Sequence, residues 1–263
     1  MILLVTILLL VCAVALHELG HAILMKRYSV TIKEICILGV GPKLFTFRWR
    51  RMFGDTPIHV RLLPIAAFVR LKYPEETENL GYAQREHIYS GGIAMNFLFA
   101  GVLIFFVCCF GAFHGHFSLV LISIFFIVVA LGGTLWFFPC IAGMCVLILG
   151  FISLGSLLYM VTVLSPTETI AGPIGIGSYI AGIHSYTAAV VFSAVMSANI
   201  GILNALPLGM LDGELITMSF LNRKFPTFMT RFGNMVYVFL FLGFLSIVAL
   251  AFGSDTVRLL QPS

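Results

Sequence analysis

One long stretch of this chain contains no charged side chain. From residue 87 to residue 167 there is not one Asp, Glu, Lys or Arg. A helix needs only about 20 apolar residues to cross the roughly 30 Å hydrocarbon core of a membrane, so this stretch can hold two or three spans. Across all 263 residues, 60% are hydrophobic, only 10% are charged and the mean hydropathy is +1.07. The chain is too apolar for a soluble domain of this size, and the sequence predicts a polytopic membrane protein.

Apolar runs of helical length predict an all-α membrane protein with about six transmembrane helices. We expect these helices at residues 2–25, 88–111, 118–138, 141–164, 186–206 and 232–252. Residues 136–139 are the only turn-like interruption between the third and the fourth, so one span plus a surface helix is an open alternative there. No charge-rich soluble domain of about 80 residues fits between these helices. We therefore expect residues 1–263 to form a single membrane domain.

The basic residues indicate how the chain is oriented in the membrane. Eleven of the fifteen Lys and Arg residues lie between Lys26 and Arg85. This clustering is typical of a cytoplasmic loop that follows a membrane span, and it predicts no binding of nucleic acid. No Lys or Arg precedes the first apolar run, which argues against a cleaved signal peptide. We expect the first helix to stay in the protein and to run from the outside to the cytoplasm.

The loop at residues 28–73 differs in kind from the helices. Short β-branched and aromatic runs alternate there with Gly39, Gly41, Pro42, Gly54 and Pro57, a pattern that favours β-hairpins. The loop is both apolar and basic, so we expect a small sheet associated with the cytoplasmic face of the membrane. An unpaired edge of such a sheet would offer an extended peptide a place to add as a strand.

Three titratable residues stand near the end of the first apolar run, in the segment HELGH. On a helix, His17 and His21 are four residues apart, so their rings lie on one face and can bind a single metal ion. Glu18 lies about 100° round the helix from His17, close enough to reach a water on that ion. An uncompensated charge at membrane depth costs about 2.5 to 3.5 kcal/mol, which disfavours a polar patch without a function.

A catalytic zinc site usually takes three protein ligands, so two histidines leave one to be found. The segment NALPLGMLDGE interrupts the fifth predicted helix at its cytoplasmic end. Pro207 removes a backbone donor and Gly209 loosens the chain, so the helix should unwind there and let Asp212 turn inward. The first and fifth helices both run inward, which places the three candidate ligands at one depth. We expect Glu214, beyond the glycine, to be a solvated charge at the membrane boundary.

These two segments together resemble the site-2 protease family of intramembrane zinc metalloproteases, whose motifs are HExxH and NxxPxxxxDG. Every fixed position is matched, by His17, Glu18, His21, Asn204, Pro207, Asp212 and Gly213. Further segments resemble the bacterial branch that includes the regulator of sigma-E protease: GVGPKLF its membrane-associated β-hairpin loop, LLPIAAFVRL its following strand, SGGIAMNFLFA its second helix and AGPIGI the segment before its late catalytic helix. The resemblance covers most of the chain except residues 112–165.

The resemblance implies an intramembrane zinc endopeptidase. Its substrate would be a single-span membrane protein cut within or near its transmembrane segment, such as an anti-sigma factor-like protein or a signal peptide remnant. Zn²⁺ would be the cofactor, Glu18 would carry the proton, and Asn204 and Pro207 would contact the substrate. The chain would lie in the lipid bilayer of a bacterial inner membrane, with the site near the cytoplasmic face.

The sequence also departs from that family. Ala66 and Ala67 stand where the family commonly has a Gly pair, and Gly91 and Gly92 stand where it commonly has Gly-Pro. Nothing between residues 111 and 166 could form the periplasmic PDZ domains of the sigma-E regulator.

Two other functions are compatible with parts of the sequence. A catalytically silent membrane protein could use the same residues to hold a metal or a substrate, although it would not need Glu18. A metal transporter would require acidic or histidine groups along several spans, and apart from the one cluster the predicted spans have none. Asn96 and Asn199, which also lie in apolar helices, are interpreted as hydrogen-bonding contacts between helices.

Overall fold

The computed structural model describes residues 1–63, 67–110, 124, 127, 139–163 and 172–260. In this part of the chain, five helices are long and apolar enough to cross a membrane. They belong to α1 (Ile2–Arg27), α4 (Tyr82–Phe110), α6 (Pro139–Val163), α9 (Tyr186–Ala205) and α11 (Pro226–Leu260). The predicted helical membrane architecture is confirmed, and these five match predicted helices, although α4 begins six residues earlier and α11 is longer at both ends. The predicted helix at 118–138 falls almost entirely outside the described residues.

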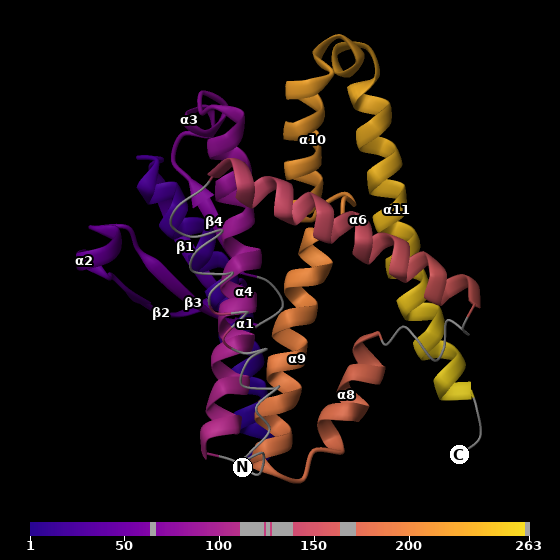
Figure 1. Ribbon diagram of the computed structural model, residues 1–263. Helices are drawn as coiled ribbons and strands as arrows, with labels where there is room; N and C mark the ends of the chain where they lie inside the picture. The colour runs from indigo at the N-terminus through magenta and orange to yellow at the C-terminus, as the bar shows by residue number, and fades with distance from the viewer. Residues whose placement is uncertain (64–66, 111–123, 125–126, 128–138, 164–171, 261–263) are drawn as a thin grey trace.

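Three of the long helices form the centre of the molecule. In the view of Figure 1, α1 and α9 run upward while α4 runs downward. The three pack against one another, and α6 crosses them obliquely while contacting α4 and α9. The shorter helices α8 (Pro173–Ala181) and α10 (Asp212–Lys224) precede and follow α9, and α11 descends beside them. The common direction of α1 and α9 agrees with the predicted topology.

A small mixed sheet follows α1 and packs against it. Its strands are β1 (Ile32–Leu38), β2 (Val40–Phe47), β3 (Ile58–Leu63) and β4 (Phe68–Leu71), in the spatial order β2-β3-β1-β4. Two one-turn helices accompany the sheet, α2 (Arg50–Phe53) between β2 and β3, and α3 (Glu75–Glu78) after β4. The predicted sheet is confirmed, but not all of its strands pair as β-hairpins. β2 and β3 pair antiparallel, whereas β1 pairs parallel with β3 and antiparallel with β4.

The sheet packs on α1 through an apolar face. Ile35 and Ile58 are paired neighbours on β1 and β3, and both are buried against Ala22 of α1. The opposite face carries polar side chains, among them Glu34, which forms an ion pair with Arg70 at 2.8 Å. β2 is left at the edge, where a strand tolerates Pro42 without losing a ladder hydrogen bond.

The crossing of α1 and α4 is unusually close. A Cβ built on Gly20 would lie 2.2 Å from the backbone oxygen of Gly91, and one built on Gly91 would lie 2.7 Å from the oxygen of Gly20. Only residues without a side chain allow two backbones to meet at such a distance. The two glycines therefore bring the helix that carries HELGH into direct backbone contact with α4.

Replacing Gly20 by Ala should loosen this crossing. The added methyl group has no space, and overpacking of this kind costs about 1–3 kcal/mol. Thermal unfolding of the purified protein in detergent should show a lower midpoint for Gly20→Ala than for the wild type. Gly155→Ala on α6 is the matched control, because a Cβ there meets no atom within 4 Å. Equal midpoints for both variants would contradict the close crossing.

Candidate metal centre

His17, His21 and Asp212 meet at one point between α1 and the start of α10. Asp212 Oδ2 lies 3.1 Å from His17 Nε2 and 3.3 Å from His21 Nε2, and the two Nε2 atoms are 3.2 Å apart. Both histidines are 7% exposed. The structure therefore brings together the three predicted ligands inside the helical bundle, although Asp212 follows His21 by 191 positions in the sequence.

The size of this triangle suits a zinc ion. Zinc bonds of about 2.0–2.1 Å in tetrahedral geometry place neighbouring ligand atoms about 3.3–3.4 Å apart, close to the distances found here. Asp212 Oδ2 is buried and has no hydrogen bond of good geometry, although both imidazoles lie beside it. The two imidazole nitrogens and the carboxylate oxygen lie close enough together to hold one ion, so the residues fit a bound metal.

The partner of His21 decides which of its nitrogens faces that centre. His21 Nδ1 lies 2.8 Å from the backbone oxygen of Ile88 on α4. A carbonyl oxygen can only accept, so Nδ1 carries the hydrogen and a neutral His21 presents the lone pair of Nε2 to the triangle. A cation is what makes such a lone pair stable beside the carboxylate of Asp212.

Asp212 reaches the histidines because the chain leaves the helix before it. α9 ends at Ala205, the residues 206–211 turn, and α10 begins at Asp212 itself. Gly213 allows this turn to close tightly, because a Cβ at that position would lie 2.3 Å from the backbone oxygens of both Ala205 and Leu206. The predicted interruption of this helix is confirmed, and the new helix α10 that follows it was not predicted.

The loop that carries Asp212 is also held from the side. The backbone N–H of Gly209 donates to the oxygen of Leu240 in α11 at 2.9 Å. A Cβ at Gly209 would lie 2.6 Å from the Cα of Phe241, so only glycine fits at this contact. α11 therefore fixes the loop that precedes the carboxylate.

Space for the two imidazole rings comes from α4. A Cβ on Gly92 would lie 2.4 Å from His21 Nε2 and 2.7 Å from His17 Nε2. Gly92 is thus a glycine at which any side chain would enter the metal centre. Neither Gly92 nor the Ile88 carbonyl was identified from the sequence, because the sequence shows no spacing that places α4 beside HELGH.

Glu18 lies one residue beyond His17 on α1 and is partly exposed. Its carboxylate is not part of the three-atom triangle. This is the placement expected of a group that contacts a water beside a metal.

The two predicted substrate residues lie at the end of α9. Asn204 is partly buried and donates to the backbone oxygen of Ile200 at 3.0 Å. Pro207 is buried in the turn, where a Cβ on Gly150 of α6 would lie 3.4 Å from its Cδ. Their role in substrate binding stays a prediction, and Pro207 contributes to packing of the turn.

Expectations for two other polar residues have different outcomes. Glu214 is 5% exposed, so the prediction of a solvated charge is wrong; it lies on the buried face of α10, and burial raises the pKa of its carboxyl group. The interpretation of Asn96 as a contact between helices is confirmed, and its partner is His17, whose Nδ1 lies 3.0 Å from the Asn96 amide.

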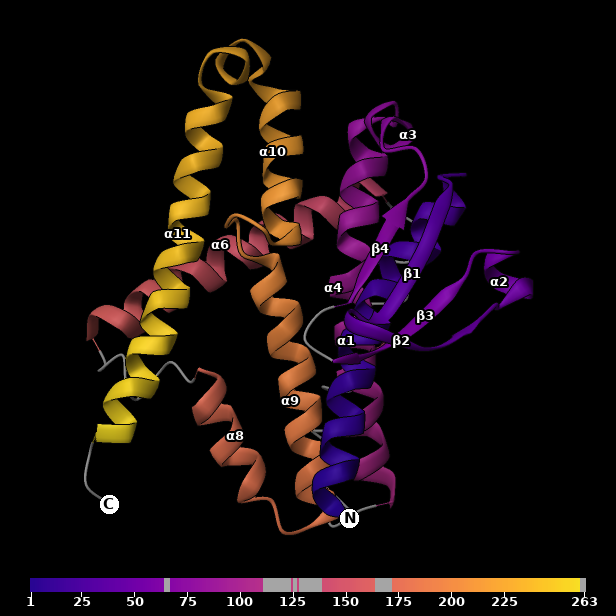
Figure 2. The same ribbon diagram turned by 180° about the vertical axis from the view of Figure 1, so that it is seen from behind.

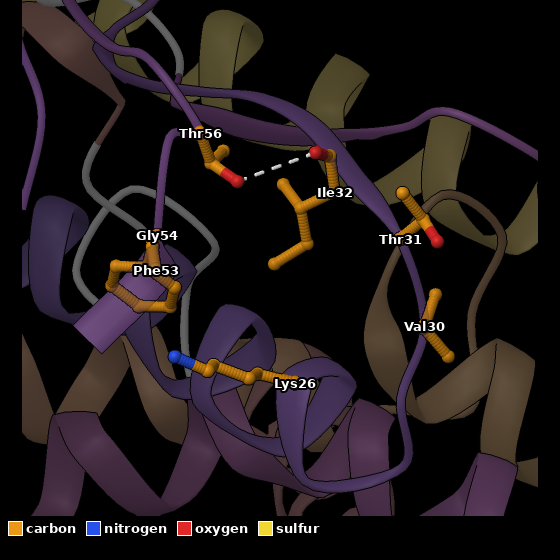
Figure 3. Close-up of a pocket in the computed structure, with 7 residues that line it drawn as sticks. All are labelled: Lys26, Val30, Thr31, Ile32, Phe53, Gly54 and Thr56. Atoms are coloured by element: carbon orange, nitrogen blue, oxygen red, sulfur yellow. Dashed lines mark hydrogen bonds between the residues drawn. The ribbon is translucent and has the colours of Figure 1, made fainter. Parts of the chain in front are cut away.

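A separate pocket lies at the end of α1, between that helix, β1 and α2 (Figure 3). Its lining residues are Lys26, Val30, Thr31, Ile32, Phe53, Gly54 and Thr56. The Lys26 ammonium group points toward the ring of Phe53, 5.9 Å from its centroid, and Thr56 donates to the backbone oxygen of Ile32. None of the three candidate ligands lines this pocket.

Residues 5–246 match the model of Peptidase family M50. The chain is similar to zinc metalloprotease RasP of Bacillus licheniformis, with 46% identity over 55 residues, and to the regulator of sigma-W protease RasP of Bacillus subtilis, with 42% over 55 residues. Each alignment covers 21% of this chain and 12% of the relative. In all the curated relatives compared, the matched part is a third of the protein or less.

Removing the carboxylate charge should empty the centre of metal. Asp212→Asn keeps the shape of the side chain but removes its charge, so zinc affinity should fall by more than the roughly 10- to 100-fold typical of an outer-shell change. Chelator competition on the purified protein measures this affinity. Asp55→Asn is the control, since Asp55 is an exposed aspartate of the sheet loop. Unchanged affinity of Asp212→Asn would exclude Asp212 as a ligand.

Proposed function

Because the chain belongs to peptidase family M50, the site-2 protease family, we propose that it is an intramembrane zinc endopeptidase that cuts membrane proteins within or near their transmembrane segments. The observation that carries this proposal is the convergence of His17, His21 and Asp212 on one point beside Glu18. A structural zinc site is closed by four protein ligands, whereas a hydrolytic one keeps a position open. The group here supplies three.

The roles of the residues follow from their placement. His17 and His21 would hold zinc through Nε2, and Asp212 through Oδ2. When bound there, zinc supplies Lewis acidity toward the scissile carbonyl and lowers the pKa of a water molecule. Two neutral imidazoles and one carboxylate leave about one positive charge on this group, which the carboxylate of Glu18 offsets.

Glu18 is the residue that moves the proton. Its carboxylate takes a proton from the attacking water and delivers it to the leaving amine nitrogen, while a C–O bond forms and the C–N bond breaks. The geometry supports this assignment because Glu18 stays outside the ligand triangle and is still partly exposed. A protein that only stored metal would gain nothing from this residue.

The substrate must present an unfolded segment, because a peptide bond in a transmembrane helix is already hydrogen-bonded and shielded. β2 lies at the edge of the sheet that packs on α1, and it exposes Leu44, Phe45 and Phe47. An unwound single-span substrate would add to this edge as a strand. Asn204, beside the turn, would hold the substrate backbone by hydrogen bonds.

The charges near the site support a proposal for its position in the membrane. We place the protein in a bacterial inner membrane with the metal near the cytoplasmic face. His21 lies six residues before the end of α1, which corresponds to a depth of about 9 Å along the helix. Lys26 and Arg27 end α1, and Arg223 and Lys224 end α10. Basic residues at both ends support a cytoplasmic location.

Glu18→Gln tests the catalytic assignment. The amide cannot accept a proton from water, so cleavage of a membrane-span reporter in proteoliposomes should fall by about 10²- to 10⁴-fold. Zinc affinity should stay near that of the wild type. Glu75→Gln is the control, since Glu75 is exposed in the short helix α3. Equal cleavage by wild type and Glu18→Gln would reject the protease in favour of a silent metal-binding protein.

Asn204→Ala tests the substrate contact. Loss of one or two hydrogen bonds to the substrate should reduce kcat/KM for the same reporter by about 2- to 10-fold, with unchanged zinc binding. The control is Asn222→Ala on α10, because Asn222 makes the same contact with its own helix, donating to the oxygen of Met218 at 2.8 Å. A loss in both variants would show that Asn204 acts through helix stability instead.

A further inference from the structure

Both histidines of the candidate centre are held from α4 at the nitrogen that faces away from the triangle. The Ile88 carbonyl oxygen is 2.8 Å from Nδ1 of His21, and the Asn96 side-chain amide is 3.0 Å from Nδ1 of His17. Ile88 offers only an acceptor, but an amide offers an oxygen on one side and a nitrogen on the other. The tautomer of His17 therefore depends on which side of Asn96 it meets.

The two orientations of that amide have opposite consequences. If the amide nitrogen donates to Nδ1, the hydrogen of a neutral His17 must sit on Nε2, where it would point into the triangle and block a metal. If the amide oxygen accepts from Nδ1–H, Nε2 presents a lone pair and can bind the ion. With the nitrogen placed toward His17, the oxygen of Asn96 is buried without any hydrogen-bond partner. Turning the amide by 180° brings this oxygen to His17.

We propose that Asn96 is a positioning residue whose side-chain oxygen accepts the Nδ1 hydrogen of His17 and so fixes the tautomer that binds zinc. This inference rests on the proposed zinc site and adds an outer residue to it. With Asn96 in this role, both histidines use the same arrangement, in which an oxygen on α4 fixes Nδ1 and Nε2 is left for the metal.

Asn96 lies in the interior of the helical bundle. The residue is 0% exposed, and Ser197 of α9 donates to its backbone oxygen at 2.9 Å. Gly201, one turn further along α9, approaches closely enough that a Cβ there would lie 3.3 Å from the Cβ of Asn96. Asn96 thus stands where α1, α4 and α9 meet, with its side-chain amide beside His17.

Zinc affinity of variants at position 96 tests the proposal. Asn96→Leu has a similar volume but no acceptor, and it should bind zinc about 10- to 100-fold more weakly than the wild type. Asn96→Asp keeps an acceptor and loses the donor, so its affinity should stay within about threefold of the wild type or exceed it. Chelator competition with zinc ions, on protein purified in detergent without substrate, gives both values.

Two further variants separate positioning from packing. Ser197→Ala removes the neighbouring contact between α9 and α4 without touching His17, and it should bind zinc as the wild type does. Asn96→Ala is measured in parallel, and its thermal midpoint shows whether a loss of affinity accompanies a loss of folding. If Asn96 only joined helices, Asn96→Leu and Ser197→Ala would both bind zinc more weakly than the wild type.

Several outcomes overturn the inference. Wild-type affinity in Asn96→Leu would show that His17 needs no acceptor, and an Asn96→Asp variant as weak as Asn96→Leu would show that the donor matters. These results concern zinc affinity alone, so they leave the cleavage test with Glu18→Gln independent. A wild-type protein that bound no zinc would instead overturn the proposed function and this inference together.

Discussion

Three electron-rich atoms lie within 3.3 Å of one another in the interior of this bundle, two imidazole nitrogens and one carboxylate oxygen. In an apolar surrounding, such an arrangement is unfavourable unless a cation or protons stand between the atoms. The rest of the described structure is organised around keeping it in place. α1 carries the two histidines, the turn at the end of α9 leads to Asp212, and α4 contacts both histidines at Nδ1.

Close approach of the helix backbones keeps these three atoms in place. Gly20 and Gly91 bring α1 onto α4, Gly92 leaves room for the rings, and Gly213 folds α10 back against the end of α9. A membrane offers little hydrophobic drive between helices, so contact between small residues is what joins them. The same closeness allows α4 to reach the far nitrogen of each histidine. The geometry of the candidate metal centre therefore depends directly on how closely the helices pack.

The sequence identifies the candidate metal ligands better than it identifies the residues that pack around them. HELGH and NALPLGMLDG could be identified because helical spacing and a helix-breaking proline are local signals, and the structure brings their three candidate ligands together. The pairing of β1 with β3 and β4 could not be derived, since register depends on which face meets α1. Glu214 was misassigned for a similar reason. Its exposure is decided by what packs against α10, and no local pattern reports this.

By itself, the sequence determined that this is a helical membrane protein and that two distant segments carry His17, Glu18, His21 and Asp212. Hydropathy and residue spacing are properties of short windows, so they can be read without knowing the fold. Only the tertiary structure decided that Asn96 and Ile88 face the histidines and that Gly92 must lack a side chain. These contacts join residues 67 and 79 positions apart, and they exist only because two glycines let α1 and α4 cross at backbone distance.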